Sequence, residues 1–192
     1  MVVFAKEPRP GHVKTRLARG IGTVAAARWF RGTALRVILG LARDPRWDVR
    51  LAVSPDREGL RSRVWPQSVP RLPQGRGDLG RRMARALRAA PPGPAVVVGA
   101  DVPGIAPARI AEAFAALGRA DAVFGPAEDG GFWLVGLKRV RAPAAESRMF
   151  DAVRWSRETT LAEALHACRG LRVAFCATLA DVDEPADLPR RP

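Results

Sequence analysis

The chain has 192 residues, 47% of them hydrophobic, which suits one domain over residues 1–192; no apolar run approaches the roughly 20 residues of a membrane span. Two cysteines and two histidines cannot build a Cys/His zinc site, so any metal is expected to be a hard cation held by carboxylates. The net charge of +13 comes from scattered arginines without a dense basic run, so nucleic acid is not the expected partner, although a nucleic-acid-binding module remains an alternative.

Apolar periodicity predicts strands that alternate with helices along the chain. The predicted strands cover residues 2–5, 48–54, 95–100, 121–124, 132–137 and 171–176. The predicted helices cover residues 24–41, 79–89, 106–117 and 159–167. This alternation is typical of an α/β fold with a mostly parallel central sheet and helices on both faces. Ligands bind at the carboxyl ends of the strands in such sheets, so the residues that follow each strand are the candidates for function.

The first predicted strand is a short apolar run that meets a charged turn directly. It lacks the charged start and the longer apolar stretch of a signal peptide, so we expect the protein to stay in the cytoplasm.

A basic loop follows this strand and contains Lys6, Gly11, Lys14 and Arg16. We expect these residues to bind the phosphates of a nucleotide, since Arg can grip phosphate oxygens with two hydrogen bonds. Lys14 and Arg16 are also predicted to stabilise the leaving group during catalysis. The loop is not a P-loop, because proline and valine stand where that motif needs glycine. A merely solvated basic loop is the alternative.

Residues 75–80 match the pattern G-x-G-x-x-G, and Asp101 lies about 20 residues further on, as in a dinucleotide-binding fingerprint. That fingerprint follows a buried strand, whereas this segment follows a short run interrupted by proline. We expect Gly77 and Asp78 to lie where a helix begins and to contact the nucleotide. A plain turn and an NAD site are the alternatives.

Asp101 stands at the carboxyl end of the continuous apolar run 95–100, and Pro103 then turns the chain away. A carboxylate in this place can hold Mg²⁺ or Mn²⁺, which neutralises a diphosphate and helps the leaving group to depart. The alternative is an aspartate that only caps the following turn.

Two further aspartates follow later strands. Asp129 lies in the glycine-rich loop 125–131, where Asp-Gly is also typical of a simple hairpin. We expect Asp129 to line the acceptor pocket and to bind a hydroxyl or act as a base. Asp183 is predicted to cap a short helix that has Pro185 in its first turn, and metal binding is compatible with that role. The tryptophans are expected in the core or at its rim.

Five motifs occur in order along the chain, at residues 4–17, 77–80, 99–103, 125–131 and 181–185. Together they resemble an uncharacterised bacterial family of the GT-A type, the radical-SAM- or selenodomain-associated transferases, in the nucleotide-diphospho-sugar transferase superfamily. The set is similar, more distantly, to the 2-phospho-lactate and molybdenum-cofactor guanylyltransferases. The resemblance spans essentially the whole chain. It implies metal-binding roles for Asp101 and Asp183 and phosphate-side roles for Lys14 and Arg16.

The resemblance leaves the transferred group open. The first loop has prolines where many nucleotidyltransferases are rich in glycine, and Val-Pro follows Asp101 where many GT-A glycosyltransferases carry Asp-x-Asp. We predict a metal-dependent transferase that uses a nucleotide sugar and a small-molecule acceptor. The alternatives are a nucleotidyltransferase acting on a small phosphorylated acceptor, and a non-catalytic nucleotide-binding protein.

Overall fold

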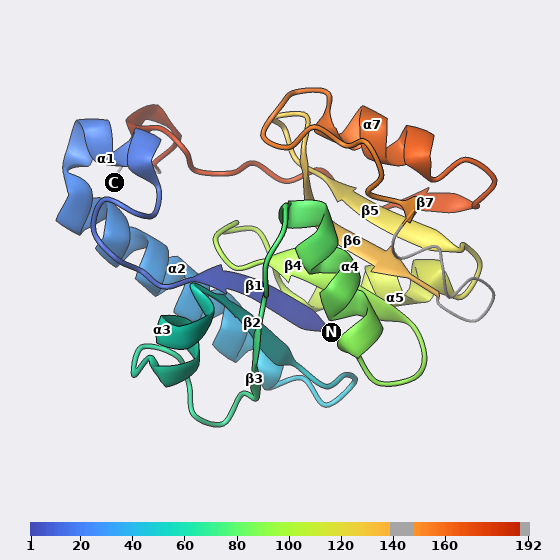
Figure 1. The fold of residues 1–192 in the computed structure, drawn as a ribbon, viewed down its shortest axis with the longest axis horizontal. Coiled ribbons are helices and arrows are strands. Elements are labelled where there is room, and N and C mark those ends of the chain that lie inside the picture. Colours follow the sequence, from blue (N-terminus) through green and yellow to red (C-terminus); the bar gives the residue numbers. More distant parts are fainter. Residues whose placement is uncertain (139–147, 189–192) are drawn as a thin grey trace.

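A computed structural model describes residues 1–138 and 148–188 of the chain (Figure 1). The strands in this part of the chain are β1 (Val2–Lys6), β2 (Arg50–Ser54), β3 (Arg71–Pro73), β4 (Ala95–Gly99), β5 (Ala122–Pro126), β6 (Phe132–Leu137) and β7 (Val173–Phe175). The helices are α1 (Thr15–Ile21), α2 (Thr23–Ala42), α3 (Asp56–Arg61), α4 (Leu79–Ala89), α5 (Pro107–Leu117), α7 (Thr160–Ala167) and the 3-10 helix η1 (Pro185–Asp187).

The strands form one sheet in the order β3-β2-β1-β4-β6-β5-β7. Neighbouring strands are parallel except at β6, which runs antiparallel to both β4 and β5. β6 is reversed because the short loop 127–131 joins it to β5 as a hairpin, and a connection of this length cannot join parallel strands. The predicted α/β class with a mostly parallel sheet is confirmed.

Helices cover both faces of the sheet (Figure 1), and alternate residues of β1 and β4 pack against one face or the other. Val3 and Val96 belong to the core beneath α2 and α5, whereas Val2 and Val97 pack on the opposite side with α4 and α7. This is the period-two alternation that a strand buried on both faces requires. In the described part of the chain, none of the helices combines the length and the hydrophobicity needed to cross a membrane.

Every predicted strand and helix is present, with ends displaced by a few residues. The elements missing from the prediction are short, namely α1, α3 and β3. β3 lies at the edge of the sheet, where Pro73 is tolerated because no outer strand needs its N–H. α1 was not predicted because the sequence carries no capping signal for it. The helix begins after Lys14, which has a positive φ and makes no side-chain cap, whereas helix prediction depends on a capping residue.

Candidate active site

A groove crosses the carboxyl ends of β1 and β4. It has two halves, a cavity of about 770 Å³ beside the first loop and one of about 250 Å³ beside the β5–β6 hairpin. We call them the basic half and the apolar half, for the side chains described below. Both halves are lined by the same central residues, Phe4, Leu79, Gly99, Asp101, Trp155, Ser156 and Asp181. The groove is therefore continuous.

Three carboxylates surround the ammonium group of Lys14 in the middle of the groove, and we call Asp101, Asp181 and Asp183 the carboxylate centre. Lys14 Nζ lies 2.9 Å from Oδ2 of Asp101, 2.7 Å from Oδ1 of Asp181 and 3.1 Å from Oδ1 of Asp183. The Lys14 side chain is only 4% exposed. Burial alone would lower the pKa of Lys14, but the charges of Asp101 and Asp181 outweigh burial and hold this pKa above its usual range. Lys14 is therefore a buried ammonium that stays charged.

The backbone sets up this cluster from segments far apart in the chain. Lys14 adopts the left-handed conformation with φ 44° and ψ 52° immediately before α1, a strained state that non-glycine residues rarely adopt. Asp101 lies two residues after the last residue of β4. Oδ1 of Asp181 also accepts a hydrogen bond of 2.6 Å from the backbone N–H of Val182, which orients its carboxylate.

The predicted capping role of Asp183 is wrong. The N-cap of η1 is Glu184, which forms a reciprocal capping box with Asp187. The backbone N–H of Asp183 donates to Oδ2 of Asp187 at 3.0 Å, so the Asp183 carboxylate is left for other partners. It contacts Lys14 and lies 3.3 Å from Nη1 of Arg16.

The carboxylate centre is short of positive charge. Burial and the neighbouring charge of Asp101 raise the pKa of Asp181 above its ordinary value, although Lys14 acts in the opposite direction. Three aspartates share one close ammonium and the exposed guanidinium of Arg16. This excess of carboxylates favours a further or stronger cation.

The donor chemistry of the carboxylate centre suits Mg²⁺ or Mn²⁺, which prefer carboxylate oxygens. Within residues 1–138 and 148–188, however, no three His, Cys, Asp or Glu side chains are arranged as a ready metal-binding set. A divalent ion bonded to all three aspartates at about 2.0–2.6 Å needs the space that Lys14 Nζ occupies. The residues therefore fit the ion in charge and donor type, provided that the Lys14 side chain moves away.

The basic half is lined by basic side chains and by carboxylates. Lys6, Arg16 and Arg82 line it, together with His12, Gln74, Asp78 and the carboxylate centre. Gln74 is 4% exposed, and its amide is oriented by hydrogen bonds to two backbone carbonyl groups and from Arg82. Sequence reasoning missed Gln74 and Arg82, although both flank the glycine segment that it did single out.

The glycine segment forms the predicted helix start. Asp78 is the N-cap of α4 and accepts a hydrogen bond of 2.8 Å from the backbone N–H of Arg81. Gly77 has φ 105°, a value that favours glycine. Asp78 lines the basic half, whereas Gly77 and Gly11 are not among the described residues that line the groove. Nucleotide contact by any of the three remains a prediction.

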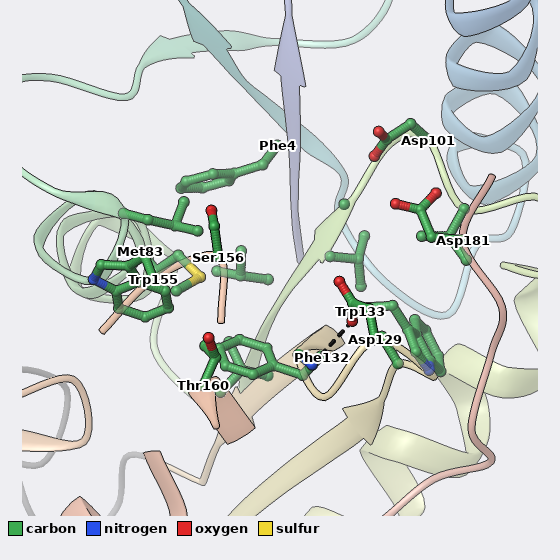
Figure 2. A pocket seen from close by; sticks show the side chains of 18 of the residues that line it. Phe4, Met83, Asp101, Asp129, Phe132, Trp133, Trp155, Ser156, Thr160 and Asp181 are labelled. Atoms are coloured by element: carbon green, nitrogen blue, oxygen red, sulfur yellow. Dashed lines mark hydrogen bonds between the residues drawn. The ribbon is translucent and has the colours of Figure 1, made fainter. Parts of the chain in front are cut away.

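The apolar half has aromatic and aliphatic walls on one side and carboxylates on the other. In Figure 2, Phe4, Met83, Phe132 and Trp155 gather opposite the carboxylates of the site. Phe132 and Trp155 pack edge to face with ring centroids 6.2 Å apart. Trp155 packs against the rim of the core, as expected, and it also lines both halves of the groove.

Asp129 lies at the edge of the apolar half, where sequence reasoning placed it beside an acceptor pocket. Its side chain is exposed, and Oδ1 accepts a hydrogen bond of 2.9 Å from the backbone N–H of Gly131 (Figure 2). Within the described ranges Oδ2 accepts no hydrogen bond, so it is free to face a ligand. Whether Asp129 is a base remains a prediction.

Gly130 lets the hairpin loop pack against the segment that carries Trp155. Its φ is 81°, and a Cβ at this position would overlap the backbone of Glu158. Gly130→Ala is expected to lower the free energy of unfolding by about 2–4 kcal/mol, because it combines a strained φ with an overlap that backbone atoms cannot relieve. Gly170→Ala is the matched control, since Gly170 has φ 88° but no heavy atom within 4 Å, and it should cost about 1 kcal/mol. Chemical denaturation measures both, and equal losses would contradict the overlap.

An ion pair ties the Trp155 segment to α7. Arg154 donates hydrogen bonds to Glu163 from its guanidinium and from its backbone N–H. The guanidinium makes the larger contribution, and together these bonds lower the pKa of Glu163 from 4.5 to about 2. A carboxyl group whose pKa is lower in the folded than in the unfolded state stabilises the fold at pH values above the unfolded-state pKa. This stabilisation is lost as the pH falls toward the folded-state pKa.

Glu163→Gln should therefore flatten the decrease in melting temperature between pH 4.5 and pH 2. Melting curves recorded across this range by circular dichroism check the result. Glu112→Gln on α5 is the control, because Glu112 is exposed and should leave the slope unchanged. An unaltered slope in Glu163→Gln would show that the pair does not act on stability.

Comparison with known proteins places the chain in a family. A profile described as "Uncharacterized protein conserved in bacteria (DUF2064)" matches residues 37–157, more than half of the chain. The chain belongs to the DUF2064 family. No curated protein matches this DUF2064 chain.

Solved structures share the fold. A proposed nucleotide-diphospho-sugar transferase from Desulfovibrio desulfuricans G20 superposes with a TM-score of 0.84 at 29% identity, over 95% of this chain and 81% of that chain. A 4-diphosphocytidyl-2C-methyl-D-erythritol synthase from Anaerococcus prevotii DSM 20548 gives 0.61 at 10% identity, over 97% and 94%. Rv0371C from Mycobacterium tuberculosis H37Rv, in complex with manganese, gives 0.58 at 17% identity, over 97% and 94%.

These findings confirm the predicted fold class and the resemblance to a family of the nucleotide-diphospho-sugar transferase type. They also support the prediction that this DUF2064 protein is a transferase.

Proposed function

We propose that this DUF2064 chain, as one domain over residues 1–192, is a metal-dependent transferase that uses a nucleotide sugar and a small-molecule acceptor. The observation that carries the proposal is the arrangement of the two halves of the groove around the carboxylate centre. A basic half and an apolar half meet at the carboxylate centre, as two substrates that exchange a group require. The Desulfovibrio neighbour, a proposed nucleotide-diphospho-sugar transferase at 29% identity, supports the same donor class.

The basic half receives the nucleotide in this proposal. Lys6, Arg16 and Arg82 provide positive charge for the diphosphate, and guanidinium groups match phosphate oxygens in geometry. The buried Gln74 has its amide already oriented by hydrogen bonds to backbone carbonyl groups. Its Oε1 accepts a hydrogen bond from Arg82, so Gln74 orients that guanidinium in the basic half.

The carboxylate centre would hold the divalent ion, with Asp101, Asp181 and Asp183 as ligands. Bound there, Mg²⁺ or Mn²⁺ supplies neutralising charge to the diphosphate leaving group. The manganese complex of the mycobacterial neighbour supports a divalent metal. Lys14, once it leaves the carboxylates, would add its ammonium charge to the same leaving group.

Asp129 acts on the acceptor in this proposal. The acceptor oxygen bonds to the anomeric carbon of the sugar, while the bond from that carbon to the diphosphate oxygen breaks. The proton of the acceptor passes to the Asp129 carboxylate, whose Oδ2 is free in the described structure.

Nucleotidyl transfer to a phosphorylated acceptor is the second candidate. It is favoured by the shared fold of the Anaerococcus neighbour, whose name describes a diphosphocytidyl product. In that reaction the same groove would bind a nucleoside triphosphate instead of a nucleotide sugar.

A thermal-shift screen of nucleoside triphosphates and nucleotide sugars, with and without Mg²⁺ or Mn²⁺, tests the proposal. A donor at 100 times its Kd stabilises the fold by about 2.7 kcal/mol, or roughly 5–10 °C for a chain of this size. A metal-dependent shift with a nucleotide sugar supports glycosyl transfer, and a shift only with a triphosphate supports nucleotidyl transfer. No shift with any compound contradicts both. A donor that binds but is never consumed indicates a non-catalytic nucleotide-binding protein.

A further inference from the structure

Positive charge is distributed unequally between the two halves of the groove. The basic half is lined by Lys6, Lys14, Arg16 and Arg82. In the apolar half, Arg157 is the one basic side chain among the described lining residues, and it is exposed. This contrast is informative because the whole chain carries 32 lysines and arginines, so the near absence of positive charge in one half is a local property.

Carboxylates line both halves, since Asp101 and Asp181 border both, but only the basic half matches its carboxylates with several basic side chains. Asp101, Asp129 and Asp181 all face the apolar half (Figure 2). Even when the ammonium of Lys14 is counted, the carboxylates outnumber the basic groups at this end of the cavity. A phosphate ester placed here would lie beside Asp129 with the exposed Arg157 as the one basic side chain in the described lining, and like charges at short range destabilise binding.

The remaining walls of the apolar half bury hydrocarbon. Phe4, Leu79, Met83, Phe132, Trp133 and Trp155 contribute to them. Trp133 is 3% exposed, and its indole N–H already donates to the carbonyl oxygen of Ala177, so it presents only an apolar surface. A volume of about 250 Å³ admits a small molecule with one ring or a short chain. Apolar walls of this kind stabilise a ligand through the surface that they remove from water.

Few polar side chains among the described lining residues of this half are free to bind a ligand. The Thr160 hydroxyl is occupied, since it donates to the carbonyl oxygens of Arg154 and Arg157. The Ser156 hydroxyl makes no hydrogen bond within the described ranges, and Oδ2 of Asp129 accepts none there. A hydroxyl of the acceptor can donate to Asp129, whereas a phosphate dianion has no proton to donate.

We infer that the acceptor of this transferase is an uncharged alcohol with an apolar body, and not a phosphate ester. The identification of this ligand as an acceptor rests on the proposed function. The chemical class of the ligand follows from the charges and walls of the apolar half alone. The apolar body packs against Met83, Phe132 and Trp155, and the hydroxyl reaches Asp129. Glycosyl transfer to a hydroxyl is thereby favoured over nucleotidyl transfer to a phosphate.

The methionines provide a local probe for the test. The chain has three methionines, and Met83 lines the apolar half but not the basic half. With ¹³C-methyl methionine in the full chain, the Met83 resonance reports a ligand in the apolar half, and Met1 is an internal reference. Met83→Leu assigns the signal. Benzyl alcohol and benzyl phosphate are the two probes, because they differ only in the phosphoryl group.

Benzyl alcohol should shift the Met83 resonance with a Kd at least about tenfold lower than that of benzyl phosphate. Asp129→Lys should tighten benzyl phosphate binding by about tenfold. Glu128→Lys makes the same change of charge at the neighbouring exposed residue, which does not line either half, and should alter the Kd less than about twofold.

Three results would overturn the inference. They are equal or tighter binding of benzyl phosphate, failure of both probes to move Met83, and equal effects of the two lysine variants. The titration uses neither nucleotide nor metal, so its failure leaves the proposed donor chemistry in place. A negative nucleotide screen, in turn, leaves the ligand preference of the apolar half in place.

Discussion

Asp101→Asn is expected to weaken metal-dependent nucleotide binding by at least about 100-fold while the fold remains intact. Asp101 borders both halves of the groove and belongs to the carboxylate centre. Asparagine keeps the shape of the side chain but removes the charge that a divalent ion requires. The aspartate is 30% exposed, and Lys14 keeps Asp181 and Asp183 as partners, so the loss of stability should be small.

Calorimetric titration with the donor found in the thermal-shift screen, at saturating Mn²⁺, measures this effect. Asp129→Asn is the matched control, because it removes one carboxylate from the acceptor end of the same groove. Its donor affinity should change by less than about twofold. Unchanged donor binding in Asp101→Asn would contradict the assigned role of the carboxylate centre, and the melting temperature verifies that the variant is folded.

Lys14→Met is expected to bind Mn²⁺ more tightly than the unmodified chain, by at least about tenfold in the absence of nucleotide. The ammonium stands within 3.1 Å of all three carboxylates, in the space that the ion needs, and it repels a divalent charge. Methionine has a similar length without the charge. If Lys14 only assisted Mn²⁺ binding, Lys14→Met would instead bind Mn²⁺ more weakly.

The same variant should be less stable without metal. Removing the buried ammonium leaves three partly exposed carboxylates close together without their shared partner, which costs about 1–2 kcal/mol. Mn²⁺ should restore the melting temperature of Lys14→Met and raise that of the unmodified chain less.

The concentration of free Mn²⁺, followed by electron paramagnetic resonance, gives both affinities directly. Lys6→Met is the control, because Lys6 lines the basic half but makes no ion pair with the carboxylate centre. It should leave Mn²⁺ affinity within about twofold of the original. Weaker Mn²⁺ binding by Lys14→Met would show that Lys14 does not compete with the ion.

Much of the fold was predictable from local patterns. The continuous apolar run before Asp101 marks a strand buried on both faces, and the proline cluster before it marks the end of α4. The position of Asp101 at the carboxyl end of β4 follows from the same pattern. Asp78 as the N-cap of α4 also agrees with the sequence, because a short side-chain oxygen before a helix is a local signal.

The short elements were less predictable because their signals are not local. η1 shows this, since its capping residue is Glu184 and not Asp183. Asp183 and Glu184 are neighbouring acidic residues that could each cap a helix. Contacts with residues distant in the sequence decide which of them does so. Asp183 lies beside Lys14 and Arg16, a fact that no window around residue 183 contains.

The amino-acid sequence by itself determined the α/β alternation, the strand ends that carry Asp101 and Asp129, and the excess of positive charge. These properties depend on neighbours along the chain, where periodicity and turn chemistry act. Only the tertiary structure decided that Lys14 meets Asp181 and Asp183 from 167 and 169 residues away. It also decided that Trp155 joins Phe4 and Phe132 in an apolar cavity. Contacts of this kind depend on the order of strands in the sheet and on the left-handed turn at Lys14, because both set which side chains converge in space.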